Sequence, residues 1–340
     1  MRDVLVVGGG PAGLAAAIDA SMAGLTVTIV EQRAGTIDKA CGEGLMPGAL
    51  PLLARLGVEP EGRPLAGVSY RASGRRVDHR FSGGPGRGVR RTTLHDALTR
   101  RVDELGIERV EAKVGAVTQT TDAVTTGSGL DARYLLACDG LHSSVARELG
   151  LAMPAIRRGR RFGLRQHHAV APWSHLIEVH YTRDAELYVT PVADDTVGIA
   201  VLGPQHTDFD AVVAAVPELA DRLAGTELSS PRRGAGPFRQ RTSARTRGRV
   251  LLVGDASGYV DAITGEGLRL GFAQASGAVR SIVAGRPGDY EAEWHRATRD
   301  FRVLTGGLVA LAQSPLRGAI VPAAERLPRV FGAIVERLAR

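Results

Sequence analysis

Three acidic residues lie far apart in the chain, and each adjoins glycine or ends an apolar run. They are Glu31, Asp139 and Asp255. Carboxylates in such places can accept hydrogen bonds from the hydroxyl groups of a ligand, and neighbouring glycines let the backbone approach it closely. The three segments therefore predict one extended, hydroxyl-rich small molecule bound jointly by distant parts of the chain. The sequence predicts no metal site.

The first acid belongs to a strand–turn–helix–strand pattern at the N-terminus. The apolar run 3–7 predicts a buried strand, the alanine-rich stretch 15–23 predicts a helix, and the run 26–30 predicts a second strand that ends at Glu31. The turn between the first strand and the helix reads Gly8-Gly9-Gly10-Pro11-Ala12-Gly13.

Each glycine of this G-x-G-x-x-G turn has a predicted physical role. Gly8 permits the tight turn, Gly10 lets the backbone approach a pyrophosphate, and Gly13 allows close packing of helix on strand. Ala12 lies in the same turn, where the free N–H groups of the helix N-terminus attract phosphate. Glu31, 18 positions past the third glycine, can bind two ribose hydroxyls. The unit predicts an adenine dinucleotide, either NAD or FAD.

Two later segments favour FAD. Residues 134–147 contain Asp139 followed by glycine, and residues 250–267 contain Asp255 preceded by glycine. With the N-terminal unit, they resemble the flavoprotein superfamily of p-hydroxybenzoate hydroxylase and the geranylgeranyl reductases, the group A flavoprotein monooxygenases, over residues 1 to about 300. The resemblance implies FAD as the cofactor. It also implies that Asp139 reaches the flavin and an approaching nicotinamide, and that Asp255 binds ribityl or ribose hydroxyls.

Four more residues enter the predicted FAD site. Arg91 matches the family's R-x-x-L helix start, which implies contact with the ribityl or phosphate side of the cofactor. Arg33 is either a second cationic contact or a solvated surface residue. Gly265 and Gly267 would let the backbone approach a flat ligand, and a helix predicted over 268–283 would direct its N-terminus at the flavin.

Cys41 begins a C-G-x-G-L segment that resembles the geranylgeranyl-reductase branch, where this loop lies against the isoalloxazine ring. Two readings stay open for Cys41. It faces the flavin or the substrate, or it is an inert cysteine in a glycine-rich loop, since reactivity needs a lowered thiol pKa.

The predicted fold is α/β: a Rossmann-like FAD-binding domain of the glutathione-reductase type, an inserted antiparallel-sheet substrate domain, and C-terminal helices. The FAD-binding domain is assigned to residues 1–63, 85–155 and 245–300. The substrate domain is assigned to 64–84 and 156–244, and the helices to 301–340. The clearest predicted strands of the insertion are 162–170, 176–181, 187–192 and 197–202.

Candidate substrate contacts are Arg165, His167 and Tyr188 in this insertion. Arg165 and His167 share one strand face by period-two alternation. His167 is also a candidate general base, and Cys41, His167 and Tyr188 are the candidate catalytic residues. For each of them a structural or surface role is the alternative.

The predicted function is an NAD(P)H-driven monooxygenase that hydroxylates a small aromatic or polyketide-like metabolite through a flavin C4a-(hydro)peroxide. NAD(P)H would be a transient electron donor, with O₂ and a small molecule as the other partners. A geranylgeranyl-reductase-type C=C reductase is the first alternative, although the segment 186–191 keeps little of the aromatic pattern expected there. A non-catalytic flavin-binding module is the second.

Composition and charge bear on the partners of the protein, its disulfide content and its location. The net charge is +7 with a sequence pI near 10, but the positive charge is almost all scattered arginine, so no nucleic-acid partner is predicted. Two cysteines are too few for a disulfide framework. With no recognised secretory signal or apolar span, the cytoplasm is the expected location. Membrane-surface contact by a basic amphipathic stretch over 327–338 is a minor alternative, and the oligomeric state stays open.

Overall fold

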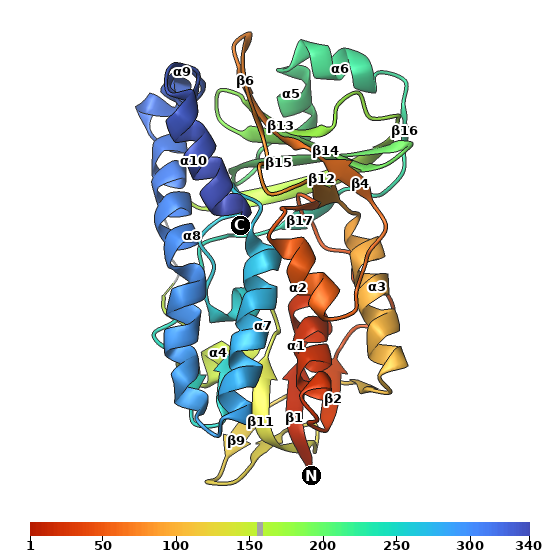
Figure 1. Cartoon of the computed structure of the whole chain (residues 1–340), viewed down its shortest axis with the longest axis vertical. Coiled ribbons are helices and arrows are strands. Elements are labelled where there is room, and N and C mark those ends of the chain that lie inside the picture. The colour runs from red at the N-terminus through yellow and green to blue at the C-terminus, as the bar shows by residue number, and fades with distance from the viewer. Residues whose placement is uncertain (155–158) are drawn as a thin grey trace.

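The computed structural model describes residues 1–154 and 159–340 and contains two sheets arranged along the long axis of the molecule (Figure 1). The N-terminus and the first sheet lie at the bottom of the view, and the second sheet lies at the top. The C-terminal helices run beside both sheets. The predicted fold class is confirmed: a Rossmann-like α/β domain carries an inserted sheet and C-terminal helices.

The first sheet is built on parallel strands in the order β19-β11-β1-β2-β8, with β18 at one edge and the strands β9 and β10 paired antiparallel beside β11. Its central strands are apolar because both of their faces are buried. The strands are β1 (Arg2–Val7), β2 (Val27–Glu31), β8 (Glu108–Glu111), β9 (Val117–Gln119), β10 (Val124–Thr126), β11 (Asp131–Ala137), β18 (Thr246–Arg247) and β19 (Val250–Leu252).

Helices cover both faces of this sheet. On one face α1 packs against α7 and α3, and a second apolar cluster that includes α4 covers the other. The helices are α1 (Pro11–Met22), α2 (Ala49–Arg55), α3 (Arg91–Glu104), α4 (Ser144–Glu148) and α7 (Gly267–Val283), with short 3₁₀ turns η1 (Gly254–Ser257) and η2 (Pro287–Asp289). Since β1, β2, β11 and β19 are parallel and adjacent, their carboxyl ends meet at one edge of the sheet. That edge brings the three predicted acidic segments together.

The second sheet follows the order β16-β12-β15-β14-β13-β5-β6, with β17 paired to β12. It is antiparallel except that β13 and β5 are parallel, and β5 and β6 come from the N-terminal half of the chain. Helices α5 and α6 cover its outer face through an apolar cluster. The elements are β5 (Gly67–Ala72), β6 (Arg75–Arg80), β12 (Arg161–Ala169), β13 (Leu176–Tyr181), β14 (Glu186–Ala193), β15 (Thr196–Pro204), β16 (Glu227–Leu228), β17 (Arg233–Ala235), α5 (Phe209–Ala214) and α6 (Pro217–Leu223).

The last part of the chain closes the inner face of this sheet. Helix α8 packs against α7 and α10, and α9 and α10 pack against β6. The remaining elements are α8 (Tyr290–Ala312), η3 (Pro315–Ala319), α9 (Ile320–Arg326), α10 (Pro328–Ala339) and a small sheet of β3 (Gly44–Leu45), β7 (Gly86–Gly88) and β4 (Arg63–Leu65). No helix in the described ranges combines the length and the apolar composition that a membrane span requires.

The element boundaries agree with the sequence patterns to within a few residues. The four strands predicted over 162–202 correspond to β12, β13, β14 and β15, and the helix predicted over 268–283 is α7. The C-terminal helices predicted from residue 301 include the end of α8, which already begins at Tyr290. The predicted domain boundary at 155–156 lies outside the described residues.

Candidate functional site

A cavity of about 980 Å³ lies between the two sheets. One end is lined by the carboxyl edge of the first sheet and the N-terminal ends of α1 and α7. The other end is lined by the inner face of the second sheet and by α10. We call these two parts the dinucleotide end and the chamber end. Every predicted cofactor residue except Gly13 lines the cavity, as do the candidates Arg165 and Tyr188.

The glycine turn at the dinucleotide end is tightly packed where it must be and open where a ligand would lie. A Cβ on Gly13 would lie 1.9 Å from the Gly8 carbonyl oxygen, so only glycine lets α1 approach β1 this closely. Gly8 has φ +108°, a conformation that favours glycine. A Cβ on Gly10 would meet nothing within 4 Å. Gly10 is also the N-cap of α1. Because no side chain caps this helix, the backbone N–H groups of its first turn are free to bind an anion.

Glu31 ends β2 beside this turn. Its carboxylate accepts hydrogen bonds from the Gly9 N–H at 2.9 Å and from the Arg33 Nε at 2.9 Å. Burial raises the pKa of Glu31, but the Arg33 side chain and the Gly9 N–H lower it by more, so the pKa lies below its ordinary value. Glu31 is thus an ionised acceptor at the cavity wall. Arg33, predicted as a cofactor contact or a surface residue, pairs with Glu31 and lines the same wall.

Asp139 is held at the carboxyl end of β11 by the start of α4. Its Oδ2 accepts hydrogen bonds from the Ser144 N–H at 2.7 Å and the Val145 N–H at 3.2 Å. Its Oδ1 is buried and has no hydrogen-bond partner in the described part of the chain. A buried carboxylate oxygen without a partner is costly, and a ligand donor at the cavity wall would satisfy it.

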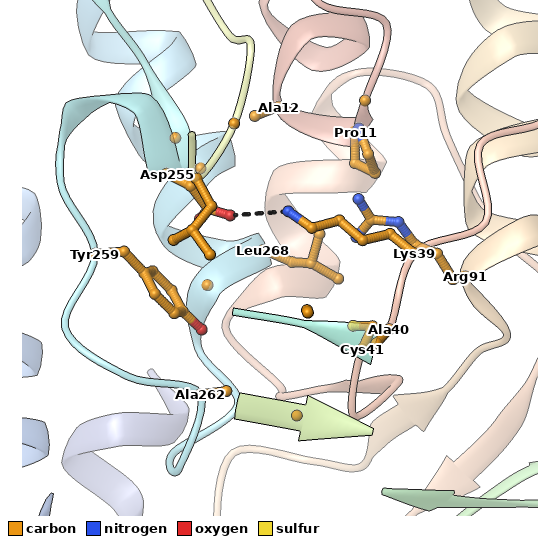
Figure 2. Close-up of a pocket in the computed structure, with 18 of the residues that line it drawn as sticks. Pro11, Ala12, Lys39, Ala40, Cys41, Arg91, Asp255, Tyr259, Ala262 and Leu268 are labelled. Carbon is orange, nitrogen blue, oxygen red and sulfur yellow. Dashed lines mark ion pairs between the residues drawn. The ribbon is translucent and has the colours of Figure 1, made fainter. Parts of the chain in front are cut away.

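Asp255 faces Lys39 across the dinucleotide end, with the Lys39 Nζ 3.6 Å from the Asp255 Oδ2 (Figure 2). Asp255 lies in η1, where Gly254 has φ +66° and a Cβ would lie 3.0 Å from the Ala12 Cβ. The glycine therefore lets η1 pack onto the turn before α1. Sequence reasoning missed Lys39, although the scarcity of lysine in so arginine-rich a chain could have drawn attention to it.

The loop 259–266 and the first turn of α7 line the middle of the cavity. Gly265 has φ +71°, and a Cβ on Gly267 would lie 3.3 Å from the Tyr259 ring. Gly265, Gly267 and Leu268 all line the cavity, so the N-terminal end of α7 is directed at it. Figure 2 shows the Tyr259 side chain beside Ala262 on the same side of the cavity. Tyr259 was not among the predicted site residues.

Arg91 begins α3 and extends toward Pro11 in the close-up (Figure 2). Its backbone N–H donates to the Glu43 Oε1 at 2.8 Å, and its guanidinium lines the cavity. The Arg91 Nε is buried without a hydrogen-bond partner in the described ranges, so an acceptor group on a bound ligand would complete its bonding.

The two cysteines differ in surroundings. Cys41 is half-buried and lines the cavity, and its Sγ accepts a hydrogen bond from the Glu43 N–H at 3.4 Å. Cys138 is buried, and burial together with the neighbouring Asp139 raises the pKa of its thiol. Both cysteines line the cavity, but Cys41 is the more exposed of the two, and Cys138 is buried just after the end of β11.

The chamber end is apolar. Tyr188 lines it, but its hydroxyl donates to the Ile263 carbonyl at 2.8 Å, and burial raises its pKa well above the ordinary value. Burial likewise raises the pKa of Tyr70 to about 12. Both phenols are therefore neutral. The apolar side chains of this wall come from the second sheet, the loop before α7 and the C-terminal helices: Val68, Phe81, Ile177, Val179, Ala200, Leu202, Phe238, Ile263, Val335 and Leu338.

Arg165 and His167 share a buried face of β12, as the alternation predicted. Arg165 lines the cavity, while His167 lies behind the wall and does not. Arg165 pairs with Asp38 and His167 with Glu43, two acids that sequence reasoning did not select. Burial raises the pKa of Asp38, but Arg165 and Arg233 lower it by more, so Asp38 is ionised.

Comparison with known families identifies the architecture. The sequence model of a family described as "FAD binding domain" matches residues 1–289. The chain belongs to this FAD-binding family. The match covers all three acidic segments that meet at the dinucleotide end, so the resemblance expected from the sequence is confirmed.

The dinucleotide end fits the FAD that this family binds. Gly10, Asp139 and Arg91 all line one cavity. The open backbone at Gly10, with the buried Asp139 Oδ1 and Arg91 Nε that have no partners among the described residues, suits the phosphates and hydroxyls of an extended dinucleotide. Gly10 and the start of α1 would hold the pyrophosphate, and Glu31 would hold the ribose. Asp139, Asp255 and the start of α7 would hold the flavin half.

Curated relatives of the FAD-binding family have several named activities. A dialkyldecalin synthase of Streptomyces rugosporus is 29% identical, over 80% of this chain and 63% of that protein. A menaquinone reductase of Mycolicibacterium smegmatis is 28% identical, over 86% of this chain and 79% of that protein. A 3-(3-hydroxy-phenyl)propionate/3-hydroxycinnamic acid hydroxylase of Mycolicibacterium gilvum is 25% identical, over 98% of this chain and 65% of that protein. This chain thus spans less than two thirds of the length of the synthase and the hydroxylase.

Solved structures show the same fold. A flavoprotein/dehydrogenase from Cytophaga hutchinsonii superimposes with a TM-score of 0.85 at 19% sequence identity, over 99% of this chain and 92% of that one. At this identity the likeness concerns the fold alone. The superposition also covers the C-terminal helices, which lie beyond the residues of the family match.

Proposed function

We propose that this protein is an FAD-dependent monooxygenase that hydroxylates a small, uncharged aromatic or polyketide-like metabolite with electrons from NAD(P)H. One observation carries the proposal: the dinucleotide end opens directly into an apolar chamber. A flavin held by the acidic segments would present its ring to a substrate in that chamber. The hydroxylase among the relatives supports the same reaction class.

Bound FAD supplies the redox chemistry, and the chain supplies placement, charge and exclusion of water. The start of α7 stabilises negative charge at the cavity centre. The chamber excludes water because its walls are aliphatic and aromatic and its phenols are neutral. The absence of an unpaired charged side chain among the described residues of the chamber wall favours a neutral substrate.

A second function, reduction of a C=C bond in a lipophilic substrate, is favoured by one specific observation. Cys41 lies in its glycine-rich loop at the cavity wall, next to the region assigned to the flavin. The menaquinone reductase among the relatives also fits this alternative. The two reactions differ in their need for O₂.

The proposal is tested with the FAD-loaded protein, NADH or NADPH, and a panel of neutral phenols, quinols and polyketide-like aromatics. A monooxygenase will consume NAD(P)H and O₂ together when its substrate is added, and the product will gain one oxygen atom. NAD(P)H oxidation that proceeds equally under argon, with a product gaining two hydrogens, would replace this function by the reductase.

A further inference from the structure

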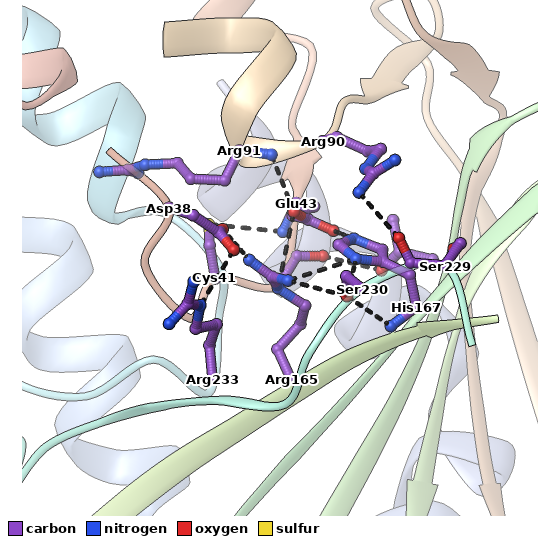
Figure 3. Close-up of polar contacts among 12 residues, drawn as sticks. Asp38, Cys41, Glu43, Arg90, Arg91, Arg165, His167, Ser229, Ser230 and Arg233 are labelled. Atoms are coloured by element: carbon purple, nitrogen blue, oxygen red, sulfur yellow. Dashed lines mark hydrogen bonds and ion pairs between the residues drawn. The ribbon is translucent and has the colours of Figure 1, made fainter. Parts of the chain in front are cut away.

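A cluster of polar side chains extends from the cavity wall into the protein, where the loop 38–44 meets β12 (Figure 3). Its members are Asp38, Glu43, Arg165, His167, Ser230 and Arg233. Glu43, Arg165 and His167 are 2%, 1% and 1% exposed. Burying so many ionisable groups is costly unless their bonds are satisfied or the groups have a function, so the cluster needs an explanation.

Three of these side chains form a continuous hydrogen-bonded chain. The Glu43 Oε2 lies 2.5 Å from the His167 Nε2, and the His167 Nδ1 lies 2.7 Å from the Ser230 Oγ. Glu43 lines the cavity, while Ser230 is half-buried. The chain therefore begins at Glu43, a residue of the cavity wall whose side chain is 1% exposed. It passes through both nitrogens of the buried His167 imidazole and ends at the half-buried Ser230.

The geometry allows one proton to move along this chain without leaving a positive charge on the buried imidazole. The Ser230 hydroxyl donates its proton to the His167 Nδ1, the Nε2 proton passes to the Glu43 carboxylate, and Ser230 takes a proton from water. One proton enters at Ser230, one is left on Glu43 at the cavity wall, and no electron moves. The reverse sequence carries a proton out.

The rest of the cluster holds this chain in place. The Glu43 Oε1 accepts the Arg91 N–H at 2.8 Å, and Glu43 has φ +60°, a backbone conformation that is unfavourable for a residue with a side chain. The Arg165 Nη1 lies 3.2 Å from the His167 Nδ1 and 3.3 Å from the Ser230 Oγ. Asp38 pairs with Arg165 outside the chain and balances its charge.

We propose that Glu43, His167 and Ser230 form a proton path between the solvent and the cavity, with Glu43 as its inner end. The inference rests on the proposed oxidoreductase function, because hydroxylation and C=C reduction both require a proton to leave or enter the cavity. The apolar chamber offers few groups to carry one. His167 acts through Glu43, so it is a positioning and relay residue rather than a group that touches the substrate.

The outer half of the path is tested without substrate or turnover. In the full chain saturated with FAD and labelled with ¹⁵N-histidine, NMR measures exchange of the His167 ring proton with water; His167→Gln assigns the signal. Ser230→Ala should slow this exchange at least tenfold, and Ser230→Thr, which keeps a hydroxyl, should restore it. Ser229→Ala is the matched control, because it removes a neighbouring hydroxyl that has no hydrogen-bond partner in the described part of the chain, and it should leave the rate within twofold. Unchanged exchange in Ser230→Ala would overturn the path.

The inner half is tested by reoxidation of reduced FAD on the protein, which needs no organic substrate. Two-electron-reduced flavin, O₂ and one proton give oxidised flavin and H₂O₂, and absorbance at 450 nm follows the reaction. Glu43→Gln keeps the size and the acceptor for the Arg91 N–H but cannot relay a proton. It should slow reoxidation at least tenfold and change the solvent deuterium isotope effect, with FAD affinity unchanged. Wild-type rate and isotope effect in Glu43→Gln would refute Glu43 as the inner end, whatever the substrate proves to be.

Discussion

The two ends of the cavity recognise their ligands in different ways. The dinucleotide end is built from backbone N–H groups and three carboxylates at the ends of parallel strands. The chamber end is built from apolar side chains of the second sheet and the C-terminal helices, with its phenols bonded internally or neutral. The first end identifies a ligand by hydrogen bonds at fixed positions, and the second by shape and by exclusion of charge. Cofactor specificity is thus encoded locally, while substrate specificity is spread over the whole fold.

The largest effect is expected at the glycine turn. Gly13→Ala places a Cβ 1.9 Å from the Gly8 carbonyl oxygen, a backbone atom that can move only by distorting the turn. FAD affinity should fall at least a hundredfold, about 3 kcal/mol, as measured by flavin fluorescence on folded protein. The matched control is Gly83→Ala, where a Cβ meets nothing within 4 Å and affinity should not change. Equal affinities in the two variants would mean that this turn does not hold the cofactor.

At the junction between the two ends, Glu266 should make the stability of the fold depend on pH. Glu266 precedes α7, is 1% exposed, and burial raises its pKa from 4.5 to about 7 despite the neighbouring Arg269. A carboxyl whose pKa is raised on folding binds protons more tightly in the folded state, so stability falls as the pH rises from about 4.5 to 7. The loss attributable to this group is about 3 kcal/mol.

Glu266→Gln removes this titration, so the unfolding free energy of the variant should decline less between pH 5 and 8 than that of the wild type. Denaturant unfolding at several pH values measures the difference. Parallel pH profiles of the two proteins would mean that burial does not raise the pKa of Glu266 at the start of α7.

The sequence predicted the dinucleotide end well and the chamber poorly. Gly8, Gly10, Glu31, Asp139 and Asp255 could be selected because each belongs to a short motif whose spacing fixes its place at a strand end. Their assembly at one edge follows from the parallel order of the strands. The roles assigned to these residues toward FAD stay predictions, as do those of Cys41, His167 and Tyr188.

The polar cluster shows why other residues were missed. Glu43 was visible in the sequence only as a letter between two glycines, and Asp38 and Ser230 belong to no motif. Their partners Arg165 and His167 come from a strand more than a hundred residues away from Glu43. Such pairings depend on how the second sheet sits over the first, which local patterns do not encode. Period-two alternation did predict that Arg165 and His167 share a face, but not that only Arg165 lines the cavity.

A bulky side chain placed in the chamber should weaken ligand binding at the chamber end without changing FAD affinity at the dinucleotide end. Ala200 lines the chamber on β15 and is 8% exposed. Ala200→Phe should weaken binding of the neutral apolar dye Nile red about tenfold, roughly 1.4 kcal/mol, and leave FAD affinity unchanged. The control, Ala214→Phe, adds the same ring at an exposed position of α5 and should affect neither. If dye binding survived in Ala200→Phe, the apolar chamber would not be the site of apolar ligands.

The smallest effect is expected at the ion pair across the dinucleotide end. Asp255→Asn keeps an acceptor for a hydroxyl but removes the negative charge opposite Lys39. FAD affinity should fall about fivefold, near 1 kcal/mol, and Lys39→Met should have a similar or smaller effect. Titration with FAD, followed by flavin fluorescence, measures the affinity of each variant. A hundredfold loss in Asp255→Asn would show that the carboxylate charge, rather than its hydrogen bond, dominates binding there.

The central claim is that the three acidic segments bind one FAD whose flavin ring faces the chamber, and a crystal structure of the complex with FAD tests it most directly. The account predicts the pyrophosphate at the start of α1, the ribose at Glu31, and the ring between Cys41 and the start of α7. Electron density for FAD outside this cavity, or with the ring turned away from the chamber, would contradict it.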